Sequence, residues 1–90
     1  MKIIASNHFL KFKKKSPARL QVEIDKKVKE ILQNPEIGEL KRGDLKGIRV
    51  YKFKHETQLL LMSYEYSENA LYLYTIGSHE NFYKKLKEYL

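Results

Sequence analysis

A short string near the end of the chain, IGSHENFY at residues 76–83, contains side chains that could do chemistry. Ser78 is a favourable helix N-cap, so we expect a helix that begins here with His79 in its first turn. Tyr83 comes four residues after His79, and residues four apart share one helix face, which would bring the imidazole and the phenol together. An imidazole can move a proton near neutral pH, and a phenol can donate, accept or stack. A simpler interpretation, in which His79 only tops the helix and Tyr83 packs into the core, fits the same spacing and is the one that spacing alone favours.

Fixed positive charge could come from residues 48–54, where the pattern I-R-V-Y-K-F-K alternates as in a strand. Lys52, Lys54 and Arg49 lie in this segment, and hairpin connections would place them across a sheet from His79. Cleavage of RNA without a metal needs a group of this composition. The 2′-hydroxyl must lose a proton, the 5′-oxygen must gain one, and the charge on the crowded phosphate must be stabilised. The candidate catalytic residues are therefore His79, Tyr83, Lys52 and Lys54.

The charge of the chain is high and unevenly distributed. The 90 residues include 18 Lys and Arg against 11 Asp and Glu, which gives a formal charge of +7. Two basic blocks suit a polyanion such as RNA, because each phosphate contact releases a condensed counterion. An acidic protein partner, or charge that serves solubility alone, would fit as well. The candidate substrate-binding residues are Lys11, Lys13, Lys14, Lys15 and Arg19 in the first block, and Lys41, Arg42, Lys46, Arg49 and the adjacent His55 in the second.

Several classes of site are excluded by composition. The chain has no cysteine, which rules out disulfides, thiolate metal sites and a cysteine nucleophile. Its histidines lack metal-ligand spacing and its glycines form no phosphate-binding loop, so we expect no metal and no cofactor. Apolar residues make up 42% of the chain, enough for one domain over residues 1–90. Without a long apolar run or a signal-peptide pattern, we expect a soluble cytoplasmic protein that does not bind membranes.

The first half of the chain reads as a strand followed by two helices. Residues 2–5 are expected to form the strand, and Ser6 or Asn7 would cap a short basic helix. Ser16 is expected to cap a second helix with Pro17 at its first position. This helix would carry one apolar stripe and end before Pro35. The stripe consists of Leu20, Ile24, Val28, Ile31 and Leu32.

The second half of the chain changes to a period of two. After a glycine-containing loop at residues 36–47, we expect strands at 48–54, 58–66 and 70–76, with a turn at 67–69. Phe82, Leu86 and Leu90 would then line a short terminal helix. The order β-α-α-β-β-β-α predicts an α+β fold. In it a small antiparallel sheet has the helical pair packed on one face.

Two segments, GDLKGIRVYKFK at 43–54 and LYTIGSHENFYKKL at 73–86, resemble the RelE/ParE superfamily of bacterial type II toxins. The string IGSHENFY is most similar to the YafQ/RelE-like branch. The resemblance implies an endoribonuclease that cuts mRNA in the ribosomal A site and is inhibited by a cognate, acidic antitoxin. It also implies a higher-order complex on operator DNA, formed through the antitoxin. By position, His79 matches the family's catalytic histidine or arginine, Tyr83 a following aromatic residue, and Lys52 and Lys54 a basic pair. His55 lies near a loop position that is basic in some members.

The chain departs from this pattern at one position. Many RelE-type members carry an arginine or histidine at the start of the next strand, where this chain has Gln58 or Leu59. Glutamine can donate a hydrogen bond but supplies no charge, so the phosphate would depend on the lysines, or His55 would substitute. Two alternatives therefore stay open. One is a ParE-like toxin that inhibits DNA gyrase by protein binding, and the other is a basic RNA-binding domain without activity.

Overall fold

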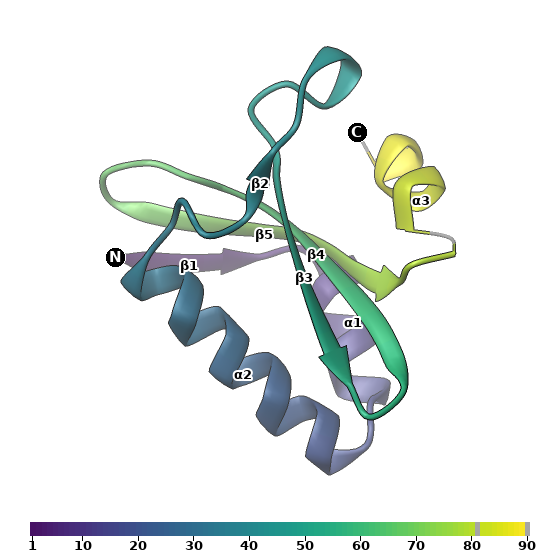
Figure 1. Cartoon of the computed structure of the whole chain (residues 1–90). Helices are drawn as coiled ribbons and strands as arrows, with labels where there is room; N and C mark the ends of the chain where they lie inside the picture. The colour runs from purple at the N-terminus through teal and green to yellow at the C-terminus, as the bar shows by residue number, and fades with distance from the viewer. Residues whose placement is uncertain (81, 90) are drawn as a thin grey trace.

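The computed structural model describes residues 1–80 and 82–89, and Figure 1 shows its arrangement. A five-stranded sheet runs in the order β1-β5-β4-β3-β2. No helix in the described part of the chain is long and apolar enough to span a membrane. The elements are β1 (Lys2–Ala5), α1 (Asn7–Lys15), α2 (Ala18–Gln33), β2 (Glu39–Leu40), a 3₁₀ turn η1 (Gly43–Leu45), β3 (Arg49–His55), β4 (Gln58–Tyr66), β5 (Ala70–Ser78) and α3 (Phe82–Tyr89).

The three long strands form the expected antiparallel meander. Strand β3 pairs with β4 and β4 with β5, both antiparallel, which confirms the α+β fold with a meander at its centre. The predicted bounds of β1 and β4 agree with the structure. Strand β1 adds to the outer edge of β5 in parallel orientation, with Lys2 opposite Ala70 and Ala5 opposite Leu73. The sheet is therefore mixed, with β1 as one edge strand.

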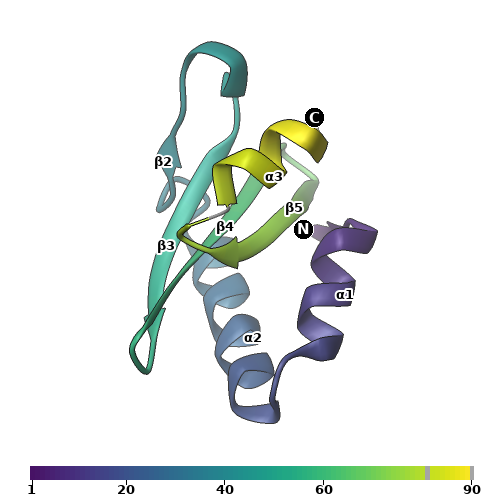
Figure 2. The same ribbon diagram turned by 90° about the vertical axis from the view of Figure 1, so that its right-hand side faces the viewer.

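The helices divide between the two faces of the sheet. Helices α1 and α2 lie together on one face, as predicted, and α3 lies on the other (Figures 1 and 2). We call these the helical-pair face and the α3 face. Leu60 and Met62 of β4 belong to the core under the helical pair, whereas Leu61 belongs to the core under α3. The alternation of one strand thus supplies both cores.

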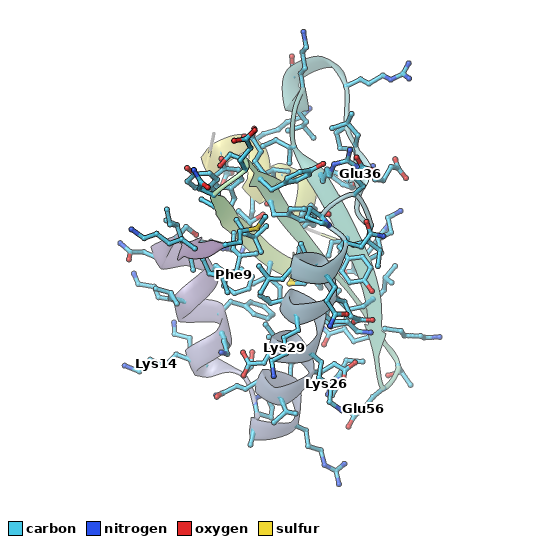
Figure 3. The ribbon with its side chains drawn as sticks, turned by 90° about the vertical axis from the view of Figure 1, so that its left-hand side faces the viewer. Phe9, Lys14, Lys26, Lys29, Glu36 and Glu56 are labelled. Atoms are coloured by element: carbon cyan, nitrogen blue, oxygen red, sulfur yellow. The ribbon has the colours of Figure 1, made fainter. Side chains whose placement is uncertain are left out.

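The larger core lies under the helical pair. The predicted stripe of α2 is buried from Leu20 to Ile31, and Leu32 is only partly buried beside it. Phe9 contributes the buried side chain of α1, and Figure 3 shows it between α1 and the sheet. Each such side chain stabilises the fold by about 1.5–3 kcal/mol when fully buried. The stripe therefore determines which side of α2 meets the sheet.

The smaller core lies under α3. Phe82 and Leu86 are 2% and 0% exposed and pack against Leu45 of η1 and Val50 of β3. The predicted loop at 36–47 therefore contains β2 and η1, which hold this segment against α3. Leu90, which we expected to join this helix face, lies outside the described residues.

The predicted start of the second helix is wrong. Ser16 ends α1, where its hydroxyl donates to the carbonyl oxygen of Phe12 at 2.7 Å. Pro17 takes the N-cap position and α2 begins at Ala18. Only Pro17 separates Ser16 from the first residue of α2, so Ser16 remains the C-cap of α1 and does not cap α2. Gln21 closes the corner by donating from Nε2 to the Ser16 carbonyl at 2.9 Å.

The predicted start of the last helix is also wrong. Strand β5 continues to Ser78, which pairs with Leu60, and α3 begins only at Phe82. His79 lies in the turn between them, where its backbone N–H donates to the Leu59 carbonyl at 3.2 Å. Continued pairing with β4 therefore takes precedence over helix capping by Ser78.

Tyr64 anchors the segment that follows α2. Its ring is fully buried, and its hydroxyl donates to the Pro35 carbonyl at 2.6 Å and accepts from the Gly38 N–H at 2.9 Å. Burial raises the pKa of this phenol. A Cβ at Gly38 would lie 2.7 Å from the hydroxyl oxygen, so the glycine is required for this approach. Arg49 donates from Nη1 to the Gly38 carbonyl at 2.8 Å and the Glu36 carbonyl at 3.2 Å.

We expect Tyr64→Phe to lower the free energy of unfolding by about 1–3 kcal/mol, because the variant leaves two buried backbone groups without a partner. Urea denaturation of both proteins measures the difference. Tyr66→Phe is the matched control, since this tyrosine is 37% exposed and its ring can still stack under Arg49. Equal stability of the Tyr64 variant and the wild type would show that water replaces the lost hydroxyl.

Candidate functional site

Lys52 and Lys54 project from the α3 face of the sheet. Val50, two residues earlier in β3, is buried in the core under α3, and alternation directs both lysines to the same side. Both are exposed, because they lie nearer the β3–β4 hairpin than the part of β3 in that core. The site therefore begins where the apolar core of this face ends.

The register of the sheet aligns these lysines with the end of β5. Lys52 pairs with Leu61, and Leu61 pairs with Gly77 on the next strand. Lys54 pairs with Leu59, whose carbonyl accepts from the N–H of His79. With strands about 4.8 Å apart, two spacings put roughly 10 Å between the backbones of the lysines and those of their partners on β5. A phosphate group could be contacted from both sides of this span.

His79 is exposed at the end of its row. It lines a shallow hollow of about 330 Å³ together with Gln58, Leu59 and Ser78. Gln58 stands at the start of β4, and among the described residues no lysine or arginine lines this hollow, whereas Glu80 does. The missing arginine or histidine of the RelE pattern is therefore a real difference in the charge of the site.

Tyr83 belongs to a different part of the same face. The prediction that it shares a helix face with His79 is wrong, because His79 precedes α3. Its ring contacts Phe82 edge-on at 5.2 Å between centroids, and the ammonium of Lys41 lies 5.3 Å from its centroid. Hydrogen bonds to Glu39 and then to Tyr83 raise the pKa of Lys41. The loop after β2 therefore holds the phenol in place over the core under α3.

Gly77 leaves the floor of this face open. A Cβ built at this position meets no atom within 4 Å. Since Gly77 shares a row with Lys52, a substrate backbone can approach the sheet closely between the lysine and the end of β5. Gly77 therefore leaves space for a ligand above the sheet, and it is not required by a positive φ angle.

Arg49 and His55 are not part of this group. Both are an odd number of residues away from Lys52 and Lys54 in β3, so the alternation of side chains along the strand directs them to the helical-pair face. Arg49 binds backbone carbonyls and its guanidinium lies 5.8 Å from the centroid of the Tyr66 ring. The prediction that Arg49 clusters with the two lysines is therefore wrong, because its charge serves the loop after α2.

The candidate residues of the two basic blocks are distributed over several surfaces of the molecule. The first block is on α1 and the start of α2, with Lys14 pointing outward in Figure 3. Within it, Lys13 pairs with Asp25, and Arg19 lies 4.0 Å from Glu56. In the second block, Arg42 and Lys46 are exposed beside η1. The fold therefore does not bring all the candidate residues together into one continuous basic surface.

A cavity that the sequence did not indicate lies between α1, the end of β5 and α3. Its volume is about 160 Å³, and His8, Phe12, Phe82 and Lys85 are among its lining residues. The Nδ1 atom of His8 is buried and has no hydrogen-bond partner in the described part of the chain. Burial and then the charge of Lys85 lower the pKa of His8. Sequence reasoning considered this histidine only as a metal ligand. No group of metal-binding side chains occurs among residues 1–80 and 82–89.

We expect the His8 ring to protonate below its ordinary pKa of 6.5. The unfolded chain then binds this proton more tightly than the folded protein does. The stabilisation is fully present above pH 6.5 and is lost as the pH falls through the lowered pKa. An NMR titration of the ring and urea denaturation against pH measure both effects, and His8→Gln should remove this part of the slope. A ring that titrates at 6.5 or above would contradict the buried position.

Comparisons with solved structures agree on the fold. The intact Escherichia coli RelBE toxin–antitoxin complex matches with a TM-score of 0.68 and 20% identity over 88% of this chain and 96% of that chain. A free double arginine-to-alanine variant of E. coli toxin RelE matches with a TM-score of 0.73 and 17% identity, over 99% and 97%. A conserved hypothetical protein from Helicobacter pylori matches with a TM-score of 0.54 and 25% identity, over 91% and 98%.

The family comparison covers nearly the whole chain. No curated protein matches this chain. Residues 3–87 match the family model described as the ParE-like toxin of type II bacterial toxin–antitoxin systems. Because this match spans far more than half of the chain, the chain belongs to the ParE-like toxins of type II bacterial toxin–antitoxin systems, which agrees with its resemblance to the RelE/ParE superfamily.

Proposed function

We propose that this toxin is an endoribonuclease that cuts mRNA on the ribosome without a metal ion. One observation carries the proposal. Lys52, Lys54 and His79 lie in adjacent rows of the α3 face, about two strand spacings apart, with open backbone at Gly77 beside them. Two cations and one proton-transfer group at this separation suit a phosphodiester.

The reaction assigns a separate task to each group. The 2′-oxygen attacks the adjacent phosphorus, its proton leaves, and the bond from phosphorus to the 5′-oxygen breaks as that oxygen gains a proton. His79 moves a proton in one of these steps as general acid or base. Lys52 and Lys54 stabilise the extra negative charge on the phosphate oxygens in the transition state. The products are a 2′,3′-cyclic phosphate and a free 5′-hydroxyl.

Tyr83 has an orienting task in this scheme. Its ring contacts Phe82 edge-on and lies 5.3 Å from the Lys41 ammonium, so both neighbours restrict its position. A fixed ring can stack on a base and restrict its rotation, at about 1–3 kcal/mol per base. Loss of the phenol hydroxyl should therefore matter less than loss of the ring.

Charge outside the site would bind the ribosome and an inhibitor. The first block on α1 and α2, and Arg42 and Lys46 beside η1, would contact ribosomal RNA phosphates. A cognate antitoxin with an acidic segment would cover the lysines, as the positive charge of +7 favours. The E. coli neighbour was solved as a RelBE complex, which supports an antitoxin partner for this chain too. An assembly on operator DNA through that antitoxin, in the cytoplasm, follows from the same proposal.

Inhibition of DNA gyrase is the second candidate function. The site offers glutamine and leucine where RelE-type nucleases have a cation, because Gln58 and Leu59 begin β4. With one protein cation fewer around the phosphate, catalysis of RNA cleavage would be weaker. Binding to gyrase does not need this cation. The family name is shared by toxins of this second kind, so gyrase has to be tested directly.

We expect expression of the wild type to arrest growth and to produce new mRNA 5′ ends by primer extension in a reconstituted translation reaction. His79→Ala should lower the cleavage rate by about 10²–10⁴-fold, because it removes a proton-transfer group. Tyr83→Phe should cost much less than Tyr83→Ala. His55→Ala is the matched histidine control, since His55 is directed to the opposite face.

Three outcomes would contradict the nuclease proposal. Unchanged cleavage by the His79 variant removes the mechanism. Inhibition of gyrase supercoiling with intact mRNA identifies the second candidate function. RNA binding without cleavage or gyrase inhibition identifies a basic domain without activity.

Lys52 and Lys54 should also determine how strongly kcat/KM for RNA cleavage depends on the salt concentration. Lys52→Ala and Lys54→Ala should each lower kcat/KM and each reduce the slope of log(kcat/KM) against log[salt] by about one, because one phosphate contact is lost. Lys26→Ala and Lys29→Ala are matched controls on the outer side of α2, where Figure 3 shows them. An unchanged slope in the site variants would mean that these lysines do not contact phosphate.

A further inference from the structure

The cavity between α1 and α3 has the size of one aromatic ring. Its volume is about 160 Å³, which is close to the roughly 150 Å³ of an engineered protein cavity that binds benzene. It opens at the free end of β5, because β1 pairs only as far as Leu73 and β5 continues to Ser78. Backbone and side chains of residues 75–78 therefore form its floor.

The lining of the cavity combines apolar side chains with polar and charged side chains. Phe12, Ile76 and Phe82 provide the apolar surface. His8 contributes a buried Nδ1 without a partner, and Lys85 is near enough for its charge to lower the pKa of that histidine. Gln58 and Ser78 add an amide and a hydroxyl. A ligand that fits must therefore be flat and apolar on its faces, polar at its edge, and negatively charged close by.

A nucleotide meets all three requirements, and simpler occupants do not. An apolar side chain of a protein partner would use the phenylalanine walls but not Gln58, Ser78 or Lys85. A small anion would use Lys85 but not the phenylalanine walls. A nucleobase offers a flat surface for the walls and in-plane donors and acceptors for the imidazole and the amide. Its phosphate can reach the lysine.

The cavity is also next to the proposed cleavage site. Gln58 and Ser78 line both this cavity and the hollow that contains His79. RNA lying across the lysines and His79 could therefore continue around the end of β5 without leaving the protein surface.

We propose that this cavity binds one nucleotide of the substrate RNA, adjacent to the scissile phosphate, with the base against Phe12 and Phe82 and a phosphate on Lys85. The inference rests on the proposed function, since it adds a subsite for the same RNA. It makes His8 and Lys85 binding residues that contribute to base preference.

The test measures binding without the ribosome. The ¹⁵N-labelled toxin, carrying His79→Ala so that it can be produced, is titrated with each of the four ribonucleoside 5′-monophosphates and with ribose 5-phosphate. We expect saturable NMR shifts at His8, Gly77 and Ser78 with at least one nucleotide and much weaker ones with the sugar phosphate. His8→Ala and Lys85→Ala should each weaken binding by about five- to tenfold. Asn7→Ala and Lys84→Ala, at neighbouring positions that do not line the cavity, should leave it unchanged.

The outcomes separate this inference from the nuclease proposal. Equal shifts with ribose 5-phosphate would reduce the site to an anion contact and overturn the inference. So would shifts caused by the cognate antitoxin but by no nucleotide, even if mRNA is cleaved normally. Nucleotide binding that depends on His8 and Lys85 supports the subsite even where mRNA cleavage fails. Gln58→Ala, at an exposed position, provides a second variant if His8→Ala does not fold.

Discussion

Strand β4 has to be buried on both faces, and the rest of the fold follows from that requirement. Leu60, Leu61 and Met62 are each 0% exposed although they point to opposite sides in turn. A helical pair covers one side, whereas in the described part of the chain the other side is covered by η1 and by α3, which is eight residues long. This short helix covers the half of the face near Val50 and leaves the hairpin half bare. The candidate site occupies the uncovered half of a face whose central strand is paired on both sides.

The period of the apolar residues made most of the fold predictable. The apolar stripe of α2 and the alternation in β3 and β4 reflect burial, and burial can be predicted from the spacing of apolar residues. Starts of helices were less predictable, since Ser16 and Ser78 have the composition of caps but their partners lie elsewhere. Ser16 bonds backward to Phe12, and Ser78 remains in the sheet because β4 is long enough to pair with it. A bond within α1 decided the first position, and pairing between strands decided the second.

The candidate site was predictable where alternation alone decides it. Lys52 and Lys54 share a face because they are two apart, and the same rule would have excluded Arg49. The separation of His79 from Tyr83 depends on where α3 begins, which the sequence did not specify. The cavity beside His8 could not have been anticipated, because it is enclosed by three elements whose distance depends on the packing of both cores. Single residues with chemical capacity, such as His8, acquire a role only once those elements meet.

The parallel pairing of β1 with β5 joins the beginning of the chain to a segment synthesised late. Ser6 donates its hydroxyl to the carbonyl of Tyr74, 68 residues further along the chain. A nascent chain cannot close its sheet until β5 has left the ribosome, and contacts at such separation form slowly. Products that terminate before β5 lack the partner of β1, one side of β4 and all of α3. Chains truncated in this way therefore cannot form the sheet that carries the candidate site.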